Sequence, residues 1–277
     1  IGYMYANGEV GEPDIEKALA AFRKAADAGV TEAHTSLAYA YLTGVGVDEN
    51  PGAAYDHYSQ AAEGGDVAAF LGLGHLYEHG IGVEQSSGVA KTWYERSARL
   101  GNVDAQLRMV GIYLQDDSAI ARRQAIYWGR EAASSGIAQA LNDYAWLLAT
   151  SKFDRDRNGI LAVDQAQRAV DSAQRAAYLD TLAAAYAEVG NFAEAISVQE
   201  RALKAITDEE AELRGELQLR LEYYQRREPW RAPEAVPAGV RGVRARQGAS
   251  RVRESARDGG RLGHVGRSRL RIERCRE

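Results

Sequence analysis

Cysteine is almost absent from this chain of 277 residues: Cys275 is the only one, so no disulfide can form within the chain. Long hydrophobic runs are absent as well, because no stretch approaches the roughly 18 apolar residues that a membrane-spanning helix needs. The first absence means that the fold depends on packing alone. The second predicts that the chain has no membrane span.

Signatures of catalysis are also missing. The chain contains no glycine loop that would hold a phosphate, no G-x-S-x-G nucleophile motif and no C-x-x-C pair. Adjacent acids such as Asp116 and Asp117 are typical of loops and helix starts, where the helix dipole favours negative charge. We therefore predict a protein that is not an enzyme, uses no cofactor and takes no small-molecule substrate.

Charge is divided unevenly along the chain. Residues 228–277 contain 13 Arg, no Lys and 6 acidic residues, a net charge of +7, whereas residues 1–227 have 21 basic and 33 acidic residues, a net charge of −12. The tail has no sustained periodicity and is predicted to be disordered; a natural basic tail and a reading-frame change both fit its composition. Because Trp230 is its only aromatic residue, we expect at most nonspecific attraction to nucleic acid, anionic lipid or the acidic body.

What the chain does have is an internal repeat. Four similar phrases of about six residues, each rich in small residues, end at Gly29, Gly65, Gly101 and Gly136, with spacings of 36, 36 and 35 residues. A period in this range that ends on glycine indicates helical hairpins stacked into a solenoid, in which each repeat contacts only its neighbours.

A second row of residues follows the same period. Tyr5, Tyr41, Tyr77 and Tyr113 lie 36 residues apart and are predicted to occupy one repeated core position. A small residue stands three places before the aromatic, as at Gly74, where a neighbouring helix can approach closely. The G-x-G-V turns at residues 44–47 and 80–83 predict a left-handed glycine that ends each helix and a valine that returns to the core.

The phrases L-G-x-L-Y-x-x-G-x-G-V and A-x-x-W/Y-x-x-x-A-A-x-x-G resemble the Sel1-like repeat family over residues 1–136. The unit at 102–136 departs from the pattern, since Gln115–Ser118 replaces the glycine turn. Because Ile1 stands inside a repeat, we expect the first repeat to be truncated and the natural N-terminus to be missing. The compartment is left open. The resemblance implies an all-α, right-handed superhelical solenoid.

Residues 137–206 resemble tetratricopeptide repeats instead. In that family the residues matching Ala183, Tyr186, Gly190, Ala195 and Ala202 are packing or turn positions. Residues 207–227 carry apolar side chains at helical spacing and are predicted to form an amphipathic helix that caps the last hairpin.

One string suggests a metal. His75-Leu-Tyr-Glu-His79 places two imidazoles one helical turn apart, as in zinc-binding helices, with Glu78 as a candidate base. A zinc-dependent hydrolase is therefore one alternative, although a third ligand would have to come from another hairpin. The other interpretation, which we prefer, is two solvent-facing histidines.

The candidate binding surface comes from superposing the repeats. Positions two before the tyrosine row, and their neighbours one helical turn away, line the concave face in tetratricopeptide geometry, and rigid aromatic side chains are typical binding anchors. The predicted partner-binding residues are Tyr39, His75, His79, Asn142, Trp146, Asp180 and Glu188. The alternative is that these aromatics fill the inside of a tightly curved superhelix.

The predicted function is a non-catalytic scaffold or adaptor that binds a protein or peptide on its concave face. The family resemblance implies the same role, commonly in bacterial envelope, signalling or secretion complexes. Two further alternatives stay open. A glycan- or peptidoglycan-facing scaffold would stack sugar rings on the same aromatics, and a structural oligomer would assemble through the ends of the solenoid.

Overall fold

The computed structural model describes residues 2–8, 11–207 and 210–231, so the predicted basic tail from residue 232 onward lies outside it. Within these residues every regular element is a helix. The α-helices are α1 (Gly2–Ala6), α2 (Ile15–Asp27), α3 (Thr31–Thr43), α4 (Pro51–Glu63), α5 (Val67–His79), α6 (Ser87–Arg99), α7 (Val103–Tyr113), α8 (Ala119–Ala133), α9 (Ala138–Thr150), α10 (Gly159–Ser172), α11 (Ala176–Glu188), α12 (Phe192–Ala205) and α13 (Leu213–Gln225). A 3₁₀ turn, Asp154–Asp156, precedes α10.

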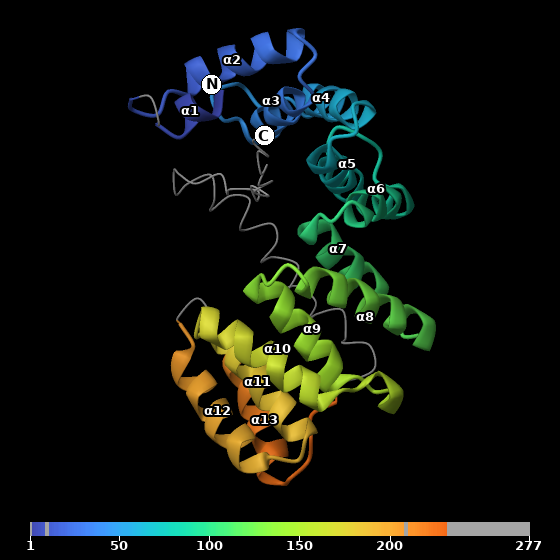
Figure 1. The fold of residues 1–277 in the computed structure, drawn as a ribbon, viewed down its shortest axis with the longest axis vertical. Coiled ribbons are helices and arrows are strands. Elements are labelled where there is room, and N and C mark those ends of the chain that lie inside the picture. The colour runs from blue at the N-terminus through green and yellow to red at the C-terminus, as the bar shows by residue number, and fades with distance from the viewer. Residues whose placement is uncertain (1, 9–10, 208–209, 232–277) are drawn as a thin grey trace, which may run out of the picture.

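The helices pair into consecutive hairpins, α1/α2 through α11/α12, and the hairpins stack on one another in chain order. Figure 1 shows the result as an arc. The predicted all-α solenoid is confirmed. Across the ranges given above, no helix combines the length and the apolar character that crossing a bilayer requires.

Polar residues begin most of these helices. Their side-chain oxygens accept the backbone N–H three residues on, which satisfies one of the unpaired donors at each helix start. These N-caps are Asp14, Asn50, Asp66, Ser86, Asn102, Ser118, Asn158 and Asn191.

The glycine turns end α3 and α5 as predicted. Gly44 has φ 70° and Gly80 has φ 68°, and each donates its N–H to the carbonyl four residues back. Val47 and Val83 then pack against buried clusters, which confirms that the valine returns to the core. The turn after α7 has no such glycine. There Asp116 accepts hydrogen bonds from the backbone N–H and the hydroxyl of Ser118, the N-cap of α8.

Small residues let helices approach closely both within one hairpin and between successive hairpins. A Cβ placed on Gly74 of α5 would lie 2.5 Å from the ring of Tyr94 on α6, and one placed on Gly72 would lie 2.5 Å from Tyr58 on α4. Real Cβ atoms essentially never come so near. Both tyrosine rings can therefore occupy these positions only because glycine has no side chain. The predicted close approach is confirmed.

The tyrosine row was predicted to be a core position, but its side chains are less buried than this prediction requires. Tyr5, Tyr41, Tyr77 and Tyr113 are half-buried, whereas the fully buried residues of α5 include Leu73, Gly74 and Leu76. The reason is that the tyrosines lie near the end of each first helix, against the edge of a second helix. Tyr77 meets Tyr55 edge-on, with ring centroids 6.2 Å apart, and Lys91 lies 4.4 Å from the ring centre of Tyr113.

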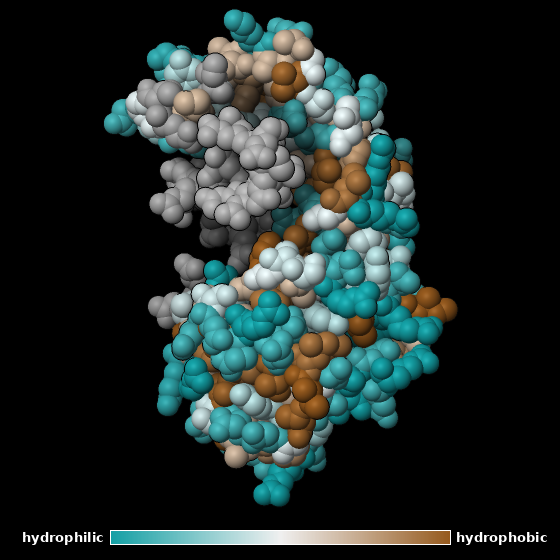
Figure 2. Space-filling view, viewed as in Figure 1, coloured by the Kyte–Doolittle hydropathy of each residue, from teal (hydrophilic) through white to brown (hydrophobic). Residues whose placement is uncertain are grey.

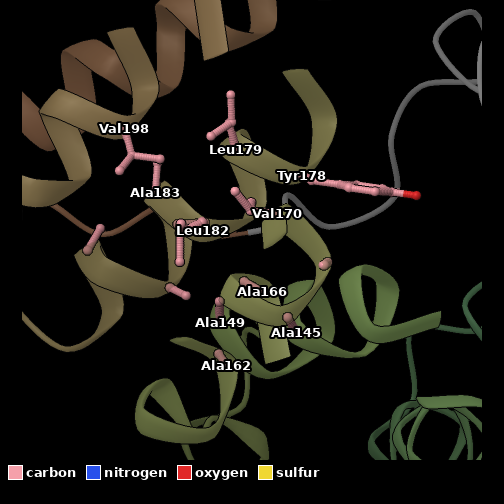
Figure 3. Packing of buried hydrophobic residues seen from close by; sticks show 14 of the residues in the cluster. Ala145, Ala149, Ala162, Ala166, Val170, Tyr178, Leu179, Leu182, Ala183 and Val198 are labelled. Atoms are coloured by element: carbon pink, nitrogen blue, oxygen red, sulfur yellow. The ribbon is translucent and has the colours of Figure 1, made fainter. Parts of the chain in front are cut away.

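The buried apolar side chains form one large cluster and three small ones. The large cluster joins α9 to α13, and alanines such as Ala145, Ala149, Ala162 and Ala166 lie where α9 meets α10 (Figure 3). Ala183, Ala195 and Ala202 are buried in it, and Gly190 has φ 78°, as the tetratricopeptide-like pattern predicts. Leu217 and Tyr224 of α13 are buried in the same cluster.

Candidate partner-binding surface

Two successive hairpins, α5/α6 and α7/α8, show which helices lie on the inner side of the arc. Figure 1 shows α5 and α7 on that side and α6 and α8 on the outer side. Apolar side chains gather along the inner edge over α5 and α7 in Figure 2, whereas the outer edge is mostly hydrophilic. The inner side is therefore the part of the surface where apolar and polar groups are both available to another molecule.

Tyr39 and His75 occupy equivalent positions on α3 and α5, and both are half-buried, which leaves part of each ring accessible. His79 lies one turn after His75 and is exposed, and the two imidazole centroids are 4.4 Å apart. Burial lowers the pKa of His75 to about 4, with a further contribution from His79 and Arg108. His75 is therefore neutral at pH 7, and the prediction of two solvent-facing histidines holds only for His79.

Glu78 is held in place by two neighbouring helices. The hydroxyl of Tyr94, on α6, donates to its Oε2 over 2.7 Å, and an Nη of Arg108, on α7, lies 3.8 Å from the same oxygen. A carboxylate engaged in this way is not a free general base. Nor do the described ranges contain any set of three or more His, Cys, Asp or Glu side chains placed to bind a metal ion. Within those ranges, His75 and His79 have no third ligand for the zinc alternative.

Asn142 and Trp146 lie one turn apart on α9. Asn142 is buried, with 6% of its surface exposed, and its Nδ2 donates to Asp143 Oδ1 over 3.1 Å. Its Oδ1 is buried and accepts no hydrogen bond from the described residues. Trp146 is half-buried, and the guanidinium carbon of Arg220 lies 5.3 Å from its ring centre. Of the two, only the indole offers exposed surface.

Asp180 is not at the surface. Arg220 Nε and Gln199 Nε2 both donate to its Oδ1, over 2.8 and 2.9 Å, and Asp180 and Arg220 are both buried. Burial disfavours the charge of Arg220, but the carboxylates of Asp180 and Glu216 raise its pKa, so it stays a cation. The carboxylate of Asp180 is used inside the protein, which corrects its prediction as a contact residue.

Glu188, at the end of α11, is also engaged within the chain. Its Oε1 accepts a bond from Arg157 Nε over 2.8 Å, and an Nη of Arg231 lies 2.6 Å from its Oε2. The side chain is only 13% exposed. The predicted row is thus open at Tyr39, His75 and His79 and covered at Asp180 and Glu188.

Three arginines that contact the predicted residues were not expected from the sequence: Arg108, Arg220 and Arg231. For Arg220 a signal was present, because Leu217, Arg220 and Tyr224 follow the i, i+3, i+7 spacing of one helix face, and all three are buried. A charged residue on an apolar stripe indicates a buried partner. No comparable spacing marks Arg231, which follows the last helix.

Comparison with known proteins agrees with this geometry. The Sel1 repeat family matches residues 1–30, 31–66, 68–102 and 110–137. No curated protein matches the chain. A Sel1 repeat protein from Oxalobacter formigenes has a similar crystal structure, with a TM-score of 0.61 and 26% identity over 74% of this chain and 85% of that one.

A second similar structure is a protective antigen present in uropathogenic Escherichia coli strains, which displays an SLR fold. Its TM-score is 0.61 and its identity is 24% over 84% of this chain, which spans 49% of the antigen's length, so it shows the fold alone. Sel1 repeat proteins are generally scaffolds for protein interaction. The resemblance drawn from the repeated phrases is confirmed: four segments between residues 1 and 137 match the Sel1 repeat.

Proposed function

We propose that this protein is a non-catalytic scaffold that binds a protein or peptide partner on its concave face. The observation that carries the proposal is the row formed by Tyr39 of α3 and His75 of α5, two partly exposed rings at equivalent positions on the inner helices. His79 extends the row by one turn. Rigid rings of this kind lose little conformational entropy when a partner buries them, which makes them effective anchors.

The chemistry of the row favours a protein over a metal or a charged small molecule. His75 is neutral at pH 7, and the nearby Glu78 is balanced by Arg108 and Tyr94, so the surface offers apolar faces and hydrogen-bonding edges rather than net charge. A mixture of aromatic surface and paired polar groups is typical of the centre of a protein interface.

Photo-crosslinking from defined positions tests the proposal. The full chain would carry a benzophenone amino acid in place of Tyr39, and a matched chain would carry it in place of Glu95, which lies on the outer helix α6. Both would be irradiated in cells that express the protein naturally. We expect a discrete protein adduct from position 39 that excess unlabelled wild-type chain suppresses, and none from position 95.

Adducts from position 95 alone, or equal adducts from both positions, would contradict binding on the concave face. If neither position gives a protein adduct while an oligosaccharide binds the wild-type chain, the glycan-facing alternative replaces the scaffold. Replacing both His75 and Tyr39 by alanine, with folding checked by circular dichroism, should abolish capture of the crosslinked partner.

A further inference from the structure

The chain reverses direction immediately after α13. Arg227 has φ 59°, the only positive φ found outside glycine in the described residues. The N–H of Glu228 then donates to the carbonyl of Tyr223 over 2.9 Å, which closes the helix end. Residues other than glycine rarely adopt this left-handed conformation, and such strained positions cluster at functional sites. The strain here directs residues 228–231 back over the preceding helices.

Trp230 packs on two residues of α13. Its ring meets Tyr223 edge-on, with centroids 5.1 Å apart and planes at 83°, and the guanidinium carbon of Arg220 lies 5.6 Å from its centre. The same guanidinium lies 5.3 Å from the centre of Trp146 on α9. One buried cation therefore contacts two indoles, one from the body and one from the returning segment, a favourable arrangement for cation–π attraction.

Arg231 contacts a further helix, α11. Its Nη lies 2.6 Å from Glu188 Oε2 at the end of α11, while Arg157 holds the other carboxylate oxygen. The side chain of Arg231 is 34% exposed, so this ion pair is partly accessible to solvent. Trp230 and Arg231 together contact α13 and α11, and Arg220 links Trp230 to Trp146 of α9. Arg231 covers Glu188, one of the residues predicted from sequence to meet a partner.

We propose that this end of the concave surface is a binding site for a peptide in which an aromatic residue precedes an arginine, and that Trp230–Arg231 occupies it as an internal ligand. The inference rests on the proposed scaffold function and names the chemistry of its partner. The indole fits against Tyr223 and Arg220, and the guanidinium fits Glu188. A partner peptide binds by displacing the segment.

Because Trp230–Arg231 competes for the site, it sets the affinity that a partner peptide needs in order to bind. A ligand tethered by a short connection acts at an effective concentration of about millimolar, so it weakens an external peptide of the same chemistry by a large factor. Removing the internal ligand should therefore expose the site and raise the affinity for that peptide. Removing residues of the same type elsewhere should not.

The experiment uses the full chain and a fluorescein-labelled peptide with the sequence of residues 226–234. Fluorescence anisotropy would compare the wild type, the double variant Trp230→Ala/Arg231→Ala and the matched control Tyr127→Ala/Arg130→Ala, which removes an aromatic and an arginine that contact each other on α8. We expect the Trp230/Arg231 variant to bind the peptide at least tenfold more tightly than the wild type or the control. Adding Glu188→Gln to that variant should weaken binding about tenfold.

Equal affinity of the wild type and the Trp230/Arg231 variant would overturn the proposal, as would equal binding of a peptide whose Trp and Arg are both alanine. If circular dichroism shows that the double variant does not fold, Arg231→Ala alone decides the question. We expect it to bind the peptide about threefold more tightly than the wild type, and no gain would overturn the proposal. The assay needs no natural partner, so its outcome is separate from crosslinking at Tyr39.

Discussion

The two halves of the solenoid are built differently. The buried residues of the first half, α1 to α8, fall into small clusters of 5, 8 and 9 residues, the last of which also includes Leu147 of α9. In the second half, α9 to α13, one cluster of 22 residues, which also includes Ala133 of α8, joins all five helices. Stacked repeats whose cores are separate gain stability from each repeat and its nearest neighbours. A shared core makes its helices depend on one another. We infer that the first half opens hairpin by hairpin and the second half opens as a unit.

The largest expected effect comes from the buried ion pair of the second half. Asp180→Asn leaves the buried guanidinium of Arg220 without its main partner, and breaking such a pair costs about 3–5 kcal/mol. The matched change in the first half, Glu95→Gln, removes an exposed pair with Arg99 and should cost about 1 kcal/mol or less. Urea denaturation of both variants measures the difference. Similar losses from the two changes would contradict a special role for buried charge in the second half.

Two leucine truncations test the difference in cooperativity directly. Leu73→Ala and Leu182→Ala each remove a side chain that is at most 2% exposed, and each should cost about 2–5 kcal/mol. Hydrogen exchange shows which helices each substitution affects. We expect Leu73→Ala to speed exchange in α5 and its adjacent helices, and Leu182→Ala to speed it throughout α9 to α13. An equally local effect of Leu182→Ala would show that the large cluster is not one cooperative unit.

Acid should weaken the first half through its buried histidines. All four histidines of the described residues lie in α3, α4 and α5, and burial lowers the pKa of both His57 and His75. For His75 the folded value is about 4 and the ordinary value 6.5, so the unfolded chain binds a proton first and stability falls as the pH drops from about 6.5 to about 4. The loss for this one residue is at most about 3 kcal/mol.

Hydrogen exchange at pH 7 and pH 4.5 measures this loss region by region. We expect faster opening of α5 at the lower pH, after correction for the intrinsic exchange rate, and a smaller change in the His75→Gln variant. The helix α11 contains no histidine and serves as the internal reference. Equal acid sensitivity of α5 and α11 would mean that carboxylates, rather than histidines, decide the response.

The smallest expected effect is a glycine test of helix spacing in the first half. Gly74→Ala places a Cβ 2.5 Å from the Tyr94 ring and should destabilise by about 1–3 kcal/mol through overpacking. Gly111→Ala, on α7, meets nothing within 4 Å and should stabilise by about 0.5–1 kcal/mol through helix propensity. Thermal melting, monitored by circular dichroism, shows whether each substitution raises or lowers the melting temperature. Stabilisation by Gly74→Ala would show that the tyrosine ring moves aside easily.

The sequence predicts the repeats well because packing recurs at a fixed spacing. Gly44, Gly80 and Gly190 are recognisable as turn residues, since few other residues accept a positive φ, and alanines such as Ala183 mark close helix contacts. Burial of the tyrosine row was overestimated, because the repeat spacing alone does not distinguish the middle of a helix–helix contact from its edge. The divisions at residues 136, 206 and 227 stay predictions.

The site was less predictable than the fold. Asp180 and Glu188 were predicted to meet a partner, yet arginines of the same chain pair with their carboxylates: Arg220 is 40 residues from Asp180. A superposition of repeats shows which positions face inward. It does not show which of those positions the chain's own side chains already cover, because this depends on a non-repeated segment and on the left-handed turn at Arg227.

The contact of Glu78 with both Tyr94 and Arg108 has a consequence for how this protein can change over evolution. The three residues belong to α5, α6 and α7, so the link crosses from one repeat into the next. Duplicating a segment that ends between Tyr94 and Arg108 would separate the copied carboxylate from its cation, whereas a segment that runs from before Glu78 to beyond Arg108 would carry both. We expect the three positions to covary among relatives and expansions of the array to preserve their spacing.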